Sequence, residues 1–302
     1  IQMVGFFVPK GTEVVSTKGK VEKTCRSYTT QTSPIFPDMP IVVLVDNQSA
    51  SAAGIVSGAL QDLKRATIVG ERTFGKGLVQ QPMAFSDGSL IRLTIARYYS
   101  PSGRCIQKPY TSGDGKSYEE DLLTRYEHGE FFNQDSIKHT GPEYHTTMGR
   151  TVYGGGGITP DIFIAEDTTN VTSYYKEASI SGLIIQFAFE YTDENRSDMA
   201  KYETMEELAK YLDKQNMVDK FVRYAEKNGL RRRNLMIRKS HKLLELFIHS
   251  RIIYNMLDEQ AWTEYINLDD PAIIKTLEVF KDRKAFPQAP DPEDGTEEDT
   301  DE

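Results

Sequence analysis

Two side chains that could carry nucleophilic or basic chemistry stand in unusual local sequences, Ser51 and Lys76. Ser51 lies between an apolar run at 41–45 and a stretch with apolar residues at helical spacing. The N-terminus of a helix presents unpaired backbone N–H groups and partial positive charge, which stabilise the oxyanion formed when a serine attacks a carbonyl. An N-cap is the commoner role of a serine at such a junction, and position alone favours it.

Lys76 stands between Gly75 and Gly77, which permit the backbone to approach another element closely. A lysine acts as a general base only as the neutral amine, which burial favours, and a solvated turn lysine is the ordinary alternative. Residues 70–76 also spell the start of a P-loop, G-x-x-x-x-G-K. Because residue 77 is neither Ser nor Thr and a β-like segment follows, we reject a nucleotide site here.

The elements that must position these two residues alternate between strand and helix. The apolar run 41–45 predicts a strand buried on both faces. Apolar residues at i, i+3, i+4, i+7, i+8 and i+11 predict a helix over 52–63. Residues 66–69 predict another strand, and 78–85 and 90–99 predict two strands joined by a turn. This order indicates an α/β or α+β domain.

Three zones of the chain differ in composition. Residues 1–170 mix short β-rich runs with glycine turns, and residues 171–284 have the apolar spacing and punctuation of helices, including a capping box at Thr204 and Glu207. Residues 285–302 are rich in proline and acid, and we predict that they are disordered.

The composition, with 38% hydrophobic and 27% charged residues, fits a globular protein and excludes a membrane-spanning or fully disordered chain. Eight acidic residues and no basic one lie at 291–302, so the formal net charge of −9 describes a tail more than a surface. The two cysteines, Cys25 and Cys105, are too few for a disulfide scaffold, and whether they pair is open. The histidines lack metal-ligand spacing, and we predict no metal and no cofactor.

Residues 43–80 (VLVDNQSASAAGIVSGALQDLKRATIVGERTFGKGLVQ) resemble the active-site region of the carboxyl-terminal processing peptidases, or tail-specific proteases. The family pattern has S-A-S-A before a helix, then D-x-x-R-A, then G-x-x-T-F-G-K-G-x-V-Q. Segments 86–89, 99–104 and 156–161 are similar to later family landmarks, so the resemblance covers roughly residues 1–165. It implies part of a crotonase/ClpP-like β-α core, which makes the helical zone an extension.

The resemblance also implies roles for four residues. Ser51 matches the nucleophile, Lys76 the general base, and Gln80 a glutamine that orients the lysine. The backbone N–H of Ala52 matches one oxyanion donor. The implied reaction is hydrolysis of peptide bonds near protein C-termini through an acyl-enzyme, in which neutral Lys76 takes the Ser51 proton.

Simple geometry qualifies two further positions. Asp62 matches a frequent family position, but a continuous helix puts it about 16 Å from the first residue of that helix. We therefore expect a structural role for Asp62, as a partner of Lys64 or Arg65. A straight strand would place Gln80 about 13 Å from Lys76, so contact between them requires a bend.

The sequence departs from the family pattern in two ways. Gly54 stands where the family usually has Glu, which weakens the helix by up to about 1 kcal/mol relative to Ala. The D-L-R-x-N-x-G-G segment that supplies the second oxyanion donor is absent, as is the PDZ domain, and residues 1–14 resemble what directly follows that segment. The sequence thus indicates a fragment, and we expect weak or no activity because one oxyanion donor is worth about 10²- to 10³-fold in rate.

The expected partners are protein or peptide substrates that present C-terminal segments, with no nucleic acid, and a homo-oligomer is compatible with the family. The resemblance implies a periplasmic or cell-envelope location. One alternative is a non-catalytic, peptide-binding remnant of the same fold. Another is a nucleic-acid-binding helical module, suggested by the basic residues at 231–242, although no nucleic-acid motif accompanies them and a solvated helix start is commoner.

Overall fold

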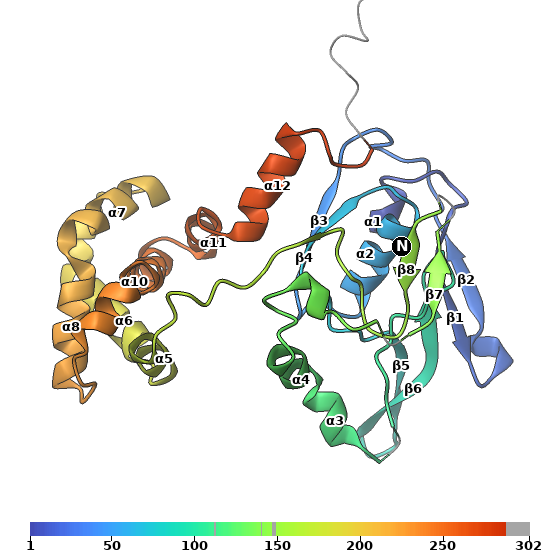
Figure 1. Ribbon diagram of the computed structural model, residues 1–302, viewed down its shortest axis with the longest axis horizontal. Coiled ribbons are helices and arrows are strands. Elements are labelled where there is room, and N and C mark those ends of the chain that lie inside the picture. The colour runs from blue at the N-terminus through green and yellow to red at the C-terminus, as the bar shows by residue number, and fades with distance from the viewer. Residues whose placement is uncertain (112, 140, 147–148, 288–302) are drawn as a thin grey trace, which may run out of the picture. The chain divides into compact units, whose positions relative to one another are not determined.

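The computed structural model describes residues 1–111, 113–139, 141–146 and 149–287. The described chain divides into two compact units, Ile1–Glu166 together with the described residues from Lys275 onward, and Asp167–Ile274. The first unit is mixed α/β and the second is helical (Figure 1). The predicted α/β class and the predicted helical C-terminal region are therefore confirmed.

The strands among the described residues of the first unit form three sheets. An antiparallel sheet has the order β2-β1-β6-β5 and a parallel one the order β3-β4-β9, while β7 and β8 form an antiparallel pair. The strands are β1 (Glu13–Gly19), β2 (Arg26–Thr29), β3 (Val42–Val45), β4 (Thr67–Gly70), β5 (Leu78–Ala84), β6 (Leu90–Tyr99), β7 (Glu143–His145), β8 (Thr151–Tyr153) and β9 (Ile162–Phe163). The short helices are α1 (Gln2–Gly5), η1 (Glu22–Thr24), α3 (Gly115–Glu119), α4 (Asp121–Glu127) and η2 (Gln134–Ser136).

Helix α2 (Ala52–Asp62) connects β3 to β4, which are parallel neighbours. Its inner face buries Ala59 and Leu60 in a core shared with Ile68 and Tyr98, so the helix predicted from apolar spacing is confirmed. The prediction that the preceding strand is buried on both faces is wrong for the described residues. Leu44 in β3 is 41% exposed, because the core covers only one face of this strand.

The second unit is built around α10 (His241–Met256), which contacts α6, α7, α8, α9 and α11. The other helices are α5 (Ser173–Ile180), α6 (Leu183–Met199), α7 (Met205–Leu212), η3 (Asp213–Gln215), α8 (Met217–Lys227), α9 (Asn234–Lys239) and α11 (Glu259–Asn267). The Thr204 hydroxyl accepts a hydrogen bond from Glu207 N, as the predicted capping box requires. The Glu207 carboxylate instead accepts from Glu203 N at 3.3 Å.

The structure divides the chain at different residues from the predicted 1–170, 171–284 and 285–302. The last helix, α12 (Pro271–Lys281), begins in the second unit and ends among residues that belong to the first. Ala285 is buried, and Ile41 N donates a 2.9 Å hydrogen bond to Phe286 O, so the start of the predicted tail is ordered. The rest of that tail, 288–302, lies outside the described residues.

The structure bears on the cysteines, whose pairing the sequence left open, and on the length of the apolar helices. Both cysteines are free thiols, Cys25 exposed and Cys105 half-buried. Burial raises the pKa of the Cys105 thiol above its ordinary value. Among the helices that the structure describes, none is long and apolar enough to cross a membrane.

Candidate active site

Ser51 occupies the turn between β3 and α2 in a backbone conformation that disfavours any side chain. Its φ of 55° and ψ of −115° are strained for a non-glycine residue, at a cost of about 1–3 kcal/mol. Its side chain makes no capping hydrogen bond, and the neighbouring Ser49 hydroxyl donates to Asp46 Oδ1 at 2.8 Å. Neither serine therefore caps α2, which removes the N-cap alternative and leaves the Ser51 hydroxyl uncommitted in the described structure.

Ala52 begins α2 and is exposed. In the part of the chain that the structure describes, no acceptor is recorded for its backbone N–H, whereas the next amide, Ala53 N, donates to Ala50 O at 3.2 Å. An unpaired N–H at a helix start favours negative charge nearby. The geometry is thus compatible with the predicted oxyanion donor.

Lys76 lies in a loop whose glycines are fixed by close packing. A Cβ on Gly75, which has a φ of 84°, would lie 3.0 Å from Gly157 N, and one on Gly77 would lie 2.9 Å from Gln107 N. The predicted close approach of this backbone to another element is therefore confirmed. Strand β5, and not a helix, follows the loop, as expected from the rejection of a P-loop.

The Tyr98 hydroxyl ties the backbones of the two candidate residues together. Its oxygen lies 2.8 Å from Ser51 O and 2.6 Å from Lys76 O, so it donates to one of these carbonyls at a time. Burial raises the pKa of Tyr98, which keeps this hydroxyl a donor at physiological pH. A second tie joins the same two loops, from Phe74 N to Ser49 O at 3.0 Å.

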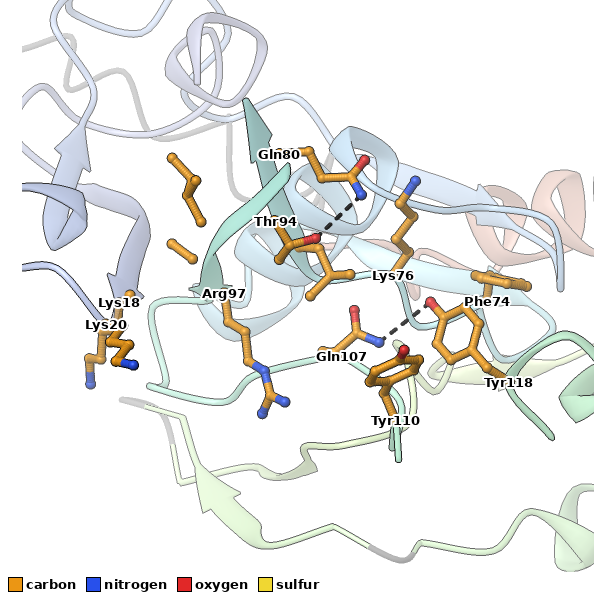
Figure 2. Close-up of a pocket in the computed structure, with 14 residues that line it drawn as sticks. Lys18, Lys20, Phe74, Lys76, Gln80, Thr94, Arg97, Gln107, Tyr110 and Tyr118 are labelled. Carbon is orange, nitrogen blue, oxygen red and sulfur yellow. Dashed lines mark hydrogen bonds between the residues drawn. The ribbon is translucent and has the colours of Figure 1, made fainter. Parts of the chain in front are cut away.

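The side chains of Ser51 and Lys76 are not joined by a hydrogen bond among those recorded for the described residues. Lys76 is half-buried and lines a pocket of about 820 Å³ together with Gln80 and Thr94 (Figure 2). The structure thus brings the two backbones together and places the amine beside a pocket large enough for a small ligand.

Gln80 lines the same pocket but bonds elsewhere. Its amide donates to Thr94 Oγ1 at 3.4 Å, and no contact with Lys76 is recorded in the described chain. The pairing of β5 with β6 shifts between Val79 and Gln80, so the strand has the irregularity that an approach to Lys76 requires. The orienting role of Gln80 remains a prediction.

Asp62 has a structural role, but the predicted partners are wrong. It pairs with Arg104 at 2.7 Å, and both side chains are 1% exposed. It also accepts hydrogen bonds from Ser100 Oγ and, at 3.1 Å, from Ser102 N. Helix α2 directs Asp62 inward at its last turn, whereas Arg65, beyond the helix, donates to backbone carbonyls that include Phe7 O at 2.8 Å.

Gly54, where the family pattern has Glu, is closely packed in this chain, and a larger residue would require the end of the Ile106 side chain to move. A Cβ there would lie 2.6 Å from Ile106 Cδ1 and 3.4 Å from Tyr98 Oη. Glycine lowers the helix propensity at this position. It also allows the first turn of α2 to lie close to Ile106 and to the Tyr98 hydroxyl.

Three residues near the site escaped the sequence analysis: Tyr98, Gln107 and Lys108. Gln107 Oε1 accepts from Gly77 N at 2.8 Å, which anchors the loop of Lys76. Lys108 is 3% exposed, with its ammonium 3.9 Å from the centroid of the Phe74 ring, and burial lowers its pKa. The sequence carries no signal for these roles, because each depends on residues brought together only by the fold.

No group of three or more His, Cys, Asp or Glu side chains in the described ranges is arranged to hold a metal ion.

Comparisons with known proteins place two families on the chain. The model of peptidase family S41 matches residues 1–116, and that of a family of unknown function (DUF8443) matches residues 174–258. The second match falls within the helical unit, where the sequence offered no recognisable motif.

Individual relatives cover only part of the chain. It is 43% identical over 107 residues to the carboxy-terminal-processing protease of Bartonella bacilliformis, a match that covers 35% of this chain and 24% of the relative. It is 54% identical over 71 residues to the carboxyl-terminal-processing protease of Synechocystis sp. (strain PCC 6803), covering 24% and 17%. The chain thus spans about a quarter or less of the length of these relatives.

Among solved structures, the photosystem II D1 C-terminal processing protease is similar, with a TM-score of 0.35 and 27% identity. That match covers 55% of this chain and 31% of the protease.

Proposed function

We propose that this chain is part of a C-terminal processing serine protease that uses Ser51 and Lys76, because the model of peptidase family S41 matches residues 1–116. The observation that carries the proposal is the strained, uncapped Ser51 at the start of α2, tied through the Tyr98 hydroxyl to the backbone of Lys76. Strain of this kind gathers at functional sites, where surrounding structure holds it in place.

The proposed reaction proceeds in two steps. Neutral Lys76 takes the proton of Ser51 as Oγ attacks the scissile carbonyl carbon, and that proton passes to the leaving amine as the C–N bond breaks. Water then hydrolyses the acyl-enzyme and frees a new carboxyl terminus. The Ala52 N–H donates to the oxyanion in both steps, and Gln80 orients the lysine.

We also propose that turnover by this chain is slow. The described residues offer one assigned oxyanion donor, the Ala52 N–H, and the loss of a donor in such sites costs about 10²- to 10³-fold in rate. The non-catalytic alternative predicts no turnover at all, so even slow Ser51-dependent cleavage distinguishes the two.

The test is cleavage of a mixture of unstructured peptides, followed by mass spectrometry of the products. We expect Ser51→Ala to reduce the rate by about a thousandfold or more, or to the detection limit. Ser49→Ala is the matched control and should leave the rate unchanged, because among the described residues Ser49 Oγ bonds only to Asp46. Equal cleavage by wild type and Ser51→Ala would refute the nucleophile.

Location and assembly are proposals that rest on the resemblance to the family alone. We propose a periplasmic or cell-envelope location and protein substrates, and a homo-oligomer is compatible with the family. Fractionation of the source cells with an antibody against the chain tests the location. Light scattering during size-exclusion chromatography tests the assembly.

A further inference from the structure

The pocket beside Lys76 has a charge pattern that the proposed hydrolysis does not use. Its lining carries four basic side chains, Lys18, Lys20, Lys76 and Arg97, and no acidic one. Lys18 lies near the end of β1, Lys20 directly follows that strand, and Arg97 lies on the neighbouring β6. Lys18 and Arg97 therefore reach the pocket from paired strands of one sheet, and Lys20 reaches it from the residue that follows β1.

The register of that sheet places like charges together. Lys18 stands directly opposite Arg97 in the β1–β6 pair, an arrangement that destabilises a sheet unless something compensates the charge. No ion pair is recorded for Lys18, Lys20 or Arg97 among the described residues. Lys18 Nζ lies 4.7 Å from the centroid of the Tyr99 ring, which stabilises a cation but does not neutralise it.

The other end of the pocket is aromatic. The centroid of Tyr118 lies 6.1 Å from that of Phe74 and 5.9 Å from that of Tyr110, both edge to face. Figure 2 shows these rings at one end of the pocket and Lys18 and Lys20 at the other. Lys108 supports the aromatic end, because its buried ammonium lies on the rings of Phe74 and Tyr118.

We infer that this pocket selects substrate segments that combine an apolar side chain with a negative charge. The inference rests on the proposed function. The apolar side chain lies against Phe74, Tyr110 and Tyr118, and a carboxylate is held by Lys18, Lys20 and Arg97. A chain-terminal carboxylate and an Asp or Glu side chain supply the same chemistry. The volume, about 820 Å³, suits a short peptide segment.

The test measures binding and not turnover, so that it is independent of catalysis. The full chain carrying Ser51→Ala is titrated into labelled peptides of one sequence that contains a Phe, and binding is followed by fluorescence anisotropy at low salt. One peptide ends in a free carboxylate, one in an amide, and a third has an amide end and an internal Asp. We expect each carboxylate to tighten binding roughly three- to tenfold, and added salt to remove the gain.

Charge removal then localises the effect. Lys20→Gln with Arg97→Gln should abolish the preference for the carboxylate, whereas the matched control, Lys10→Gln with Lys23→Gln, removes two exposed charges outside the pocket and should keep it. The free-carboxylate and internal-Asp peptides distinguish a terminal from a side-chain source.

Three results would overturn the inference: equal affinity for charged and amidated peptides, an unchanged preference in the Lys20 and Arg97 variant, or displacement of every peptide by a single-stranded oligonucleotide at lower concentration. The proposed function is judged separately, by Ser51-dependent cleavage of the amidated peptide. Ser51-dependent cleavage without a preference for charged peptides would support the proposed protease function and refute only the basic subsite.

Discussion

At the scale of single residues, two features define the candidate site: the strained backbone of Ser51 and the hydroxyl of Tyr98, a residue that no sequence pattern identifies. Ser51 has a positive φ and no capping role. Tyr98 reaches the carbonyls of Ser51 and Lys76, which precede it by 47 and 22 residues. The junction of strand and helix could be predicted from apolar spacing, whereas a hydroxyl that bridges two distant carbonyls could not.

The strain at Ser51 predicts that stability and activity change in opposite directions. Glycine adopts a φ of 55° without the cost that a Cβ imposes, so Ser51→Gly should raise the free energy of unfolding by about 1 kcal/mol relative to Ser51→Ala. Both variants should lose cleavage. Urea unfolding of the two proteins makes the comparison, and a Ser51→Gly protein less stable than Ser51→Ala would contradict the strain.

Removing the Tyr98 hydroxyl should loosen the two loops. Tyr98→Phe removes the one donor that the two carbonyls share, and we expect a loss of stability of about 1–3 kcal/mol. Because the hydroxyl bonds to the backbones of the two residues proposed to act in the chemical step, we expect kcat to fall about tenfold or more while KM changes little. Tyr28→Phe, a half-buried tyrosine elsewhere in the unit, is the control. A rise in KM at constant kcat would argue against a positioning role.

At the scale of elements, α2 joins the site to the core. Its first turn contacts Ile106 and Tyr98 through Gly54, and its last turn ends at the buried pair of Asp62 and Arg104. Helical spacing predicted the extent of α2, but not the partner of Asp62, which lies 42 residues later in the chain. Local spacing therefore identifies the element, and only the tertiary fold identifies the pair.

The buried pair should couple strongly. Replacing Arg104 by Met leaves a charged carboxylate buried and should destabilise the first unit by about 3–5 kcal/mol. Adding Asp62→Leu should cost less than the sum of the single replacements, because it removes the unpaired charge. A double-mutant cycle by urea unfolding measures the coupling. The exposed pair of Arg196 and Asp193 provides a reference cycle, for which about 0–1 kcal/mol is expected. Equal couplings in the two cycles would refute this role.

At the scale of the whole molecule, the chain combines a mixed α/β unit, whose residues 1–116 match the model of peptidase family S41, with a helical unit that has its own core. The sequence predicted a β-rich zone followed by a helical one and placed the end of the helical zone at residue 284. In the structure, the division between the two units falls within α12. Apolar spacing predicts that a segment is helical, but it does not show which compact unit the helix packs in. Of the site itself, the glycine loop and the serine junction were predictable, and the bridging and anchoring side chains were not.

The helical unit should lose stability in acid because of one buried histidine. His249 is fully buried, and burial lowers its pKa to about 4 from an ordinary value near 6.5. The stability that depends on its neutral form is therefore complete above about pH 6.5 and is lost as the pH falls toward 4. The loss by pH 4.5 should be about 2–3 kcal/mol.

The single tryptophan, Trp262, lies on α11 of the same unit, so its fluorescence during urea unfolding reports this change. His249→Gln should show a weaker dependence on pH than wild type, and the exposed His241→Gln should match wild type. If wild type and His249→Gln lost equal stability between pH 7 and pH 4.5, the assignment would fail.

Covalent labelling by a fluorophosphonate tests the proposed nucleophile most directly, because it requires no knowledge of the substrate. The Ser51 oxygen displaces fluoride from phosphorus, and the modified peptide is located by mass spectrometry. We predict labelling at Ser51 that is absent from Ser51→Ala, retained in Ser49→Ala, and slowed about tenfold or more in Lys76→Met. An unlabelled Ser51 in the folded protein, or labelling that is as fast without Lys76, would contradict the Ser51–Lys76 mechanism.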